Sequence, residues 1–99
     1  DRTTTKWRAL LVSPAGVIIQ QDQRRHLQDS IPQIKIVDTC SPYQFSVYPE
    51  ASYDFIISMV PIKNASKPVA EVSRMTKGQQ VQFIEEFLFD KMDGKDCFP

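Results

Sequence analysis

Three short runs of apolar residues constrain the fold of this chain more than any other feature. They are Trp7–Val12 (WRALLV), Ile34–Val37 (IKIV) and Phe55–Val60 (FIISMV). Continuous runs of this kind are typical of parallel strands buried on both faces, whereas strands with one exposed face alternate apolar and polar residues. A shorter run, Pro68–Val72 (PVAEV), predicts a fourth strand with its proline at the edge.

The segments between these runs have the pattern of helices. Val17–Ser30 contains no interior glycine or proline. Ile19, Leu27 and Ile31 recur at multiples of four, as on one face of a helix. Pro32 forbids continuation, so we expect this helix to end before it.

Two further helices are expected. Ser41 and Pro42 predict the start of a short one, with Ser41 as N-cap, and Pro49 ends it. The longest helix is expected over Thr76–Met92, with Gly94 as its stop.

Strands separated by helical segments indicate right-handed parallel crossovers, and unbroken apolar strands indicate a sheet covered on both faces. We therefore expect an α/β fold, a four-stranded parallel sheet flanked by helices on both faces. One domain over 7–92 accounts for the pattern, with a linker at 1–6 and a tail at 93–99. Ligands of such sheets bind beyond the carboxyl ends of the strands, which points to the loops Ser13–Gly16 and Pro61–Lys67.

Composition excludes several classes of function. Lysine plus arginine and aspartate plus glutamate both number 12, so the net charge is zero and the basic excess of a nucleic-acid-binding domain is missing. Two cysteines, Cys40 and Cys97, give no disulfide framework, and a single histidine gives no metal site of the usual kind. No apolar run approaches the ~20 residues that span a membrane. We expect a cytoplasmic domain with no cofactor and no metal.

The segment Tyr53–Pro61 (YDFIISMVP) is similar to the YDLIISTVP of enzyme IIB domains from the sugar phosphotransferase system. A strand, loop and helix, then IKIVD, then PVAEVS extend the resemblance over most of Trp7–Met92. The closest likeness is to the IIB-like domains of transcription regulators that also carry phosphotransferase regulation domains (PRDs). This resemblance implies a Rossmann-like sheet with the strand order 2-1-3-4.

The first loop departs from that family, which places a phosphate-accepting cysteine after the first strand in patterns such as CxxGxG[TS]S. Ser13 stands in the cysteine position, and Gly16 retains the first glycine. Ile18 replaces the second glycine, and Ile19-Gln20 replaces the small hydroxyl pair. The degenerate phosphoacceptor loop thus comprises Ser13, Pro14, Ala15 and Gly16.

These changes remove both the nucleophile and the phosphate cradle. A serine hydroxyl needs a general base, and no His, Asp or Glu neighbours Ser13 in the sequence. Bulky β-branched residues at Ile18 and Ile19 hinder the backbone N–H nest that would hold a phosphate. We expect a catalytically inactive loop, with Ser13 as a turn residue that caps the first helix. Cys40, after the second strand, is expected to be a semi-buried structural thiol.

A kept fold without the cysteine resembles the C-terminal IIB-like domains of Mga/AtxA-type virulence regulators. The resemblance implies a regulatory module that self-associates, most simply as a dimer, next to other domains of the same regulator. One alternative is a phosphoryl-accepting enzyme IIB component that uses Ser13 or Cys40. Another is a sensor of anions or sugar phosphates, with Lys63 and Lys67 supplying positive charge.

The last helix leaves two interpretations open. At ~100° per residue, Val81, Phe83, Ile84, Phe87 and Leu88 span about 160° of one side, and Phe89 lies outside that arc. The first interpretation is a wide core face with one exposed aromatic residue. The second is an apolar interface for another protomer, formed by Phe83, Phe87 and Phe89.

Overall fold

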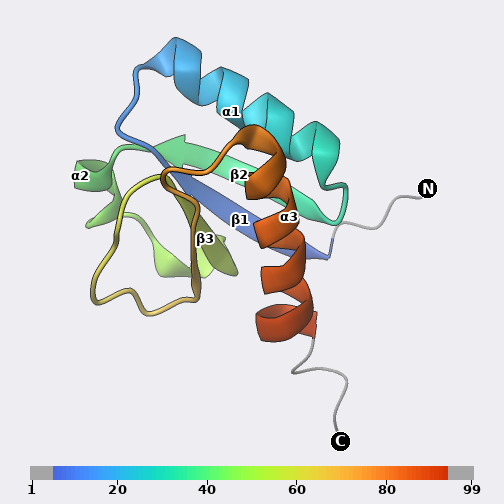
Figure 1. Cartoon of the computed structure of the whole chain (residues 1–99). Helices are drawn as coiled ribbons and strands as arrows, with labels where there is room; N and C mark the ends of the chain where they lie inside the picture. Colours follow the sequence, from blue (N-terminus) through green and yellow to red (C-terminus); the bar gives the residue numbers. More distant parts are fainter. Residues whose placement is uncertain (1–5, 94–99) are drawn as a thin grey trace, which may run out of the picture.

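The apolar runs form the sheet at the centre of the protein (Figure 1). Its strands are β1 (Trp7–Val12), β2 (Ile34–Cys40), β3 (Phe55–Ser58) and β4 (Val69–Glu71). All pairs are parallel and the order is β2-β1-β3-β4, which confirms the predicted fold class and strand order. The computed structural model describes residues 6–93, so the expectations for Gly94, Cys97 and most of both terminal segments lie outside the described residues.

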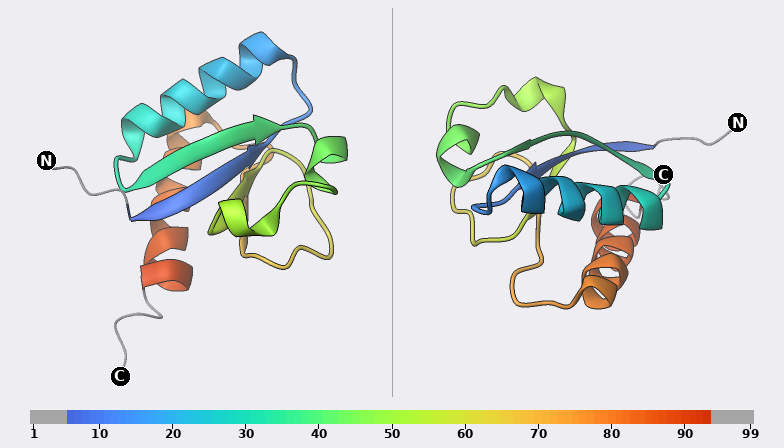
Figure 2. Two further views of the ribbon diagram at one scale, coloured as in Figure 1. Left: turned by 180° about the vertical axis from the view of Figure 1, so that it is seen from behind. Right: turned by 90° about the horizontal axis from the view of Figure 1, so that it is seen from above.

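The helices divide unequally between the two faces of the sheet (Figure 2). The long helices α1 (Val17–Ser30) and α3 (Lys77–Phe87) lie together on one face, and η2 (Leu88–Asp93) continues α3 with wider, π-type turns. The other face carries α2 (Pro42–Phe45) and the single turn η1 (Glu50–Ser52). That second face therefore depends on short elements and loops for its cover.

Side-chain caps fix where two helices begin. Ser41 Oγ accepts from the N–H of Gln44, whose side chain accepts in turn from the Ser41 N–H, which confirms the predicted N-cap. Thr76 and Gln79 form the same reciprocal pair ahead of α3. Thr76 is thus the cap of α3 and not its first residue, because its hydroxyl occupies an otherwise unpaired N–H.

Each face of the sheet has its own apolar core. The larger core lies between the sheet and α1 and α3, and it is built by alternate strand residues such as Ala9, Leu11 and Phe55. The smaller core lies under α2 and the loops, and consists of Leu10, Val12, Cys40, Tyr53 and Ile56. From Ala9 onward both sets of alternating residues in β1 are buried, which is why that part of the run is continuously apolar.

A β-bulge in β2 decides which core Cys40 joins. Ala9 pairs with Ile36, but Leu10 pairs with Asp38, so Val37 is the extra residue. A one-residue shift turns every following side chain to the opposite face. Ile36 therefore packs in the larger core and Cys40 in the smaller one, and β2 runs three residues past the end predicted from IKIV.

The outer edge of β2 is bonded by side chains of α1. Gln28 Nε2 donates to the Ile34 carbonyl at 2.6 Å, and the Ile36 N–H donates to Gln28 Oε1 at 2.8 Å. Arg24 Nη2 donates to the Ile36 carbonyl at 2.8 Å. These bonds occupy backbone groups that a foreign strand would otherwise pair with.

Candidate functional site

Ser13, at the start of the loop after β1, is held by hydrogen bonds within the loop and to β2 and α1. The Ser13 side chain is buried, and its Oγ accepts from the Ala15 N–H at 3.2 Å. The Ser13 N–H donates to the Cys40 carbonyl at 2.9 Å, and the Ser13 carbonyl accepts from Gln20 Nε2 at 2.9 Å. None of these partners can act as a general base, so the geometry does not activate the hydroxyl.

The residue that caps α1 is Gly16. Its backbone is extended, with φ −68° and ψ 171°, and no side chain bonds the first N–H groups of the helix. The expectation that Ser13 caps this helix was wrong, because Ser13 lies three residues earlier and its hydroxyl is bound to Ala15.

The first turn of α1 presents three successive large aliphatic side chains to solvent. Val17, Ile18 and Ile19 are 70%, 85% and 56% exposed, and we call these residues the α1 aliphatic surface. Ile19 was expected to face the core, and that expectation was wrong. At ~100° per residue Ile19 lies about 80° around the helix from the buried Leu27, so a spacing of eight does not keep the two on one face.

Cys40 is buried at the carboxyl end of β2, in the smaller core. Burial, together with the smaller effect of the neighbouring Asp38 carboxylate, raises the pKa of its thiol to about 11. A thiol with this pKa is protonated at neutral pH, so Cys40 is a poor nucleophile. Its surroundings fit a structural thiol.

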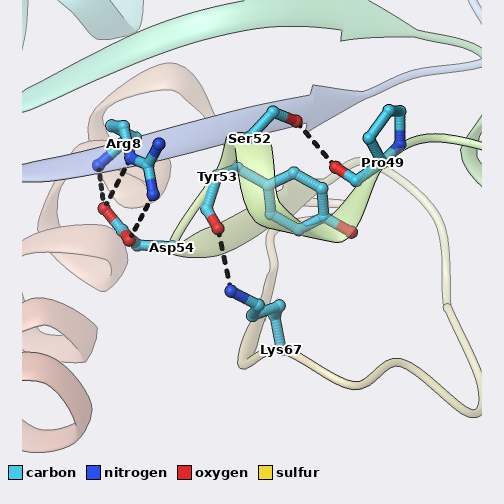
Figure 3. A network of polar contacts seen from close by, with 6 residues as sticks. All are labelled: Arg8, Pro49, Ser52, Tyr53, Asp54 and Lys67. Atoms are coloured by element: carbon cyan, nitrogen blue, oxygen red, sulfur yellow. Dashed lines mark hydrogen bonds and ion pairs between the residues drawn. The ribbon is translucent and has the colours of Figure 1, made fainter.

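The structure does not bring Lys63 and Lys67 together at the first loop. Lys67 Nζ donates to the Tyr53 carbonyl at 3.1 Å and lies 5.8 Å from the centre of the Tyr53 ring (Figure 3). Tyr53 precedes β3, so this contact lies near the amino ends of the strands, where the paired side chains of Arg8 and Asp54 also lie. A crossover to a parallel strand has to return to that edge, which separates Lys67 from the loop after β1.

The three expected interface phenylalanines occupy different environments. Phe87 is only 9% exposed, and its ring centroid lies 5.6 Å from that of Phe55 in the larger core. Phe83 is partly buried against the same core. Phe89 is 69% exposed. Phe87 therefore belongs to the core, and its place in the expected interface was wrong. Of the three residues, only Phe89 is largely exposed.

A pocket on the second face was not predicted from the sequence. It has a volume of about 450 Å³ and lies between α2 with its following turn and the loop after β3, with Tyr53 in its lining. The aromatic residues Phe45, Tyr48 and Tyr53 line it. These aromatic residues lie close together in the short segment between β2 and β3, which could have indicated a pocket. Hydrophobic periodicity, however, does not tell which face of the sheet so short a segment covers.

Two negative findings apply to residues 6–93. No three His, Cys, Asp or Glu side chains gather there as ligands for a metal ion. No helix in this range has the length and the apolar character that crossing a membrane requires.

Comparisons with known proteins yield no relative. No family model matches the chain, and no curated protein or solved structure matches it at a significant level. Function has to be argued from the site itself, because a parallel α/β sheet hosts many unrelated activities.

Proposed function

We propose that this chain is a catalytically inactive, enzyme IIB-like regulatory domain of a cytoplasmic bacterial transcription regulator, and that it binds a second copy of itself. Other domains of the regulator would contact DNA, which agrees with the zero net charge of this one. The observation that carries the proposal is the α1 aliphatic surface. Large exposed aliphatic side chains stand where the family that the sequence resembles needs small residues around a phosphate.

The geometry of the first loop supports a loss of phosphotransfer. The Ser13 hydroxyl is buried and already accepts a hydrogen bond from the backbone. The Cys40 thiol is buried as well, and its raised pKa of about 11 leaves little thiolate at neutral pH. Neither group offers the exposed, activated nucleophile that accepting a phosphoryl group requires.

The α1 aliphatic surface offers three exposed aliphatic side chains to a dimer interface. Burial of one isoleucine side chain stabilises a complex by about 1.5–3 kcal/mol. In a symmetric dimer each residue of the interface occurs twice. Replacing Ile18 by a charged residue therefore removes about 3 kcal/mol or more, which corresponds to about a hundredfold in Kd.

Sedimentation equilibrium over a wide concentration range tests the association. The variant Ile18→Asp should shift the dimer to monomer, and Val47→Asp, which places the same charge at a residue 83% exposed elsewhere, should not. Ile18→Asp keeps the fold, because α1 has no acidic residue in its first turn and a carboxylate is favourable at a helix N-terminus. Phe89→Asp tests the second candidate surface, and a loss of dimer in that variant alone would move the interface to the end of α3.

Mass spectrometry after incubation with the phosphoryl donors of the phosphotransferase system tests the absence of chemistry. We expect the mass of the chain to remain unchanged. A phosphoryl adduct on Ser13 or Cys40 would overturn the proposal and favour an enzyme IIB component.

A further inference from the structure

The pocket on the second face of the sheet exists because that face has little regular cover. α2 has four residues, and the loop between β3 and β4 lies over the sheet without secondary structure. Their side chains meet only in part, which leaves the cavity of about 450 Å³. Cavities of this size match the range in which proteins bind small organic molecules.

Hydrogen bonds outside the cavity hold its walls in place. The Tyr48 hydroxyl donates to Asp38 Oδ2 at 2.8 Å, which fixes one aromatic wall. The Lys67 ammonium holds the end of the opposite loop to the Tyr53 carbonyl (Figure 3). The Tyr48 and Tyr53 ring centroids are 6.1 Å apart, with the rings tilted by 52°. A ligand would therefore meet a preformed site and would lose little affinity to ordering it.

The lining combines an apolar surface with two opposite charges. Phe45, Tyr48 and Ile62 are partly buried against the smaller core and present apolar area to the cavity. Glu50 and Lys63 line the same cavity and are exposed. Neither of them forms an ion pair with a described residue. A ligand that suits this lining has an apolar body, an anionic group for Lys63 and a cationic group for Glu50.

We propose that this pocket binds a small zwitterion with an apolar side chain, of the class of the aromatic α-amino acids. The carboxylate of the ligand pairs with the Lys63 ammonium, and its ammonium group pairs with the Glu50 carboxylate. Its ring lies against Phe45 and Tyr48. This site is on the face opposite α1, so it is separate from the proposed self-association surface.

Titration of the ¹⁵N-labelled chain with L-phenylalanine, followed by ¹H–¹⁵N correlation spectra, tests the proposal. We expect saturable shifts at the amides of Ser46, Glu50 and Asn64, with a Kd of about 1 mM for a ligand of this size. Phenylacetate lacks the ammonium group, phenethylamine lacks the carboxylate, and glycine lacks the ring. Phenylacetate and phenethylamine should each bind up to about fivefold more weakly, because one exposed ion pair is lost. Glycine should bind at least about tenfold more weakly, because the contact of the ring is lost.

Two variants assign the charges, and both residues are exposed, so neither change should disturb the fold. Lys63→Gln and Glu50→Gln should each raise the Kd, by up to about fivefold. Lys35→Gln, an exposed lysine on β2, is the matched control and should leave it unchanged. An absence of shifts up to about 20 mM L-phenylalanine would overturn the proposal. Equal binding of phenylacetate or phenethylamine, or wild-type affinity in both variants, would overturn it as well.

Discussion

Replacing Gln28 by alanine should destabilise the fold through the edge of the sheet. The Gln28 amide makes two hydrogen bonds to the backbone of β2, at 2.6 Å and 2.8 Å. Each such bond contributes about 0.5–1.5 kcal/mol net. In the variant, water can bond the backbone groups that Gln28 leaves, because the sheet edge is open, and alanine has a slightly higher helix propensity. Both effects place the combined loss from the two hydrogen bonds in the lower half of the range that their sum allows. We expect the free energy of unfolding to fall by about 1–1.5 kcal/mol.

Urea denaturation followed by circular dichroism measures this change. If the free energy of unfolding falls by about 1 kcal/mol per M urea, the urea concentration at the unfolding midpoint should fall by about 1 M. Gln21→Ala is the matched control, because Gln21 is exposed on the same helix and the chemical change is identical. Gln28→Glu should cost more than Gln28→Ala, since a carboxylate oxygen would then face the Ile34 carbonyl, which needs a donor. Equal midpoints for Gln28→Ala and Gln21→Ala would refute the reasoning.

Three further predictions concern the core, the thiol and the response to acid. Phe87→Ala should lower the free energy of unfolding by about 3–5 kcal/mol, and Phe89→Ala by less than about 0.5 kcal/mol, as measured by urea denaturation. In a Cys97→Ser background, Cys40 should react with a thiol reagent at neutral pH only as fast as the protein unfolds, and rapid reaction of the folded chain would contradict its burial. The hydrogen bonds from the Arg8 guanidinium lower the pKa of the Asp54 carboxyl below its usual value of 3.8. The Arg8–Asp54 pair therefore stabilises the fold above that pH, and this stabilisation is lost as the pH falls through the lowered pKa. Asp54→Asn should reduce the acid dependence of the unfolding free energy, and an unchanged dependence would show that the pair contributes nothing.

Local sequence signals were sufficient for the elements of the fold. β1 and α1 have the predicted bounds, Trp7–Val12 and Val17–Ser30. The Ser13–Gly16 turn and Pro32 end regular structure through their own backbone dihedral angles and the missing N–H of proline. This effect is local and does not depend on distant contacts. The parallel sheet followed from continuous apolar runs, because burial on both faces leaves that pattern in the sequence.

The features that the sequence did not predict depend on pairing between distant segments. The bulge at Val37 becomes visible only in the register between β1 and β2, and it places Cys40 in the smaller core. The edge bonds of Gln28 require α1 to lie beside β2. For the last helix the periodicity placed Phe87 inside the core arc and Phe89 outside it but left two interpretations open, and the packing of Phe87 against Phe55 decides for the core face with an exposed Phe89.

The most direct test of the account is whether the α1 aliphatic surface contacts a second copy of the chain. Isotope-filtered nuclear Overhauser spectra of a mixture of ¹³C-labelled and unlabelled protein detect contacts between copies. We predict intermolecular signals from the methyl groups of Val17, Ile18 and Ile19, and their loss in Ile18→Asp. Intermolecular signals confined to Phe89, or none at concentrations where sedimentation shows a dimer, would contradict the account.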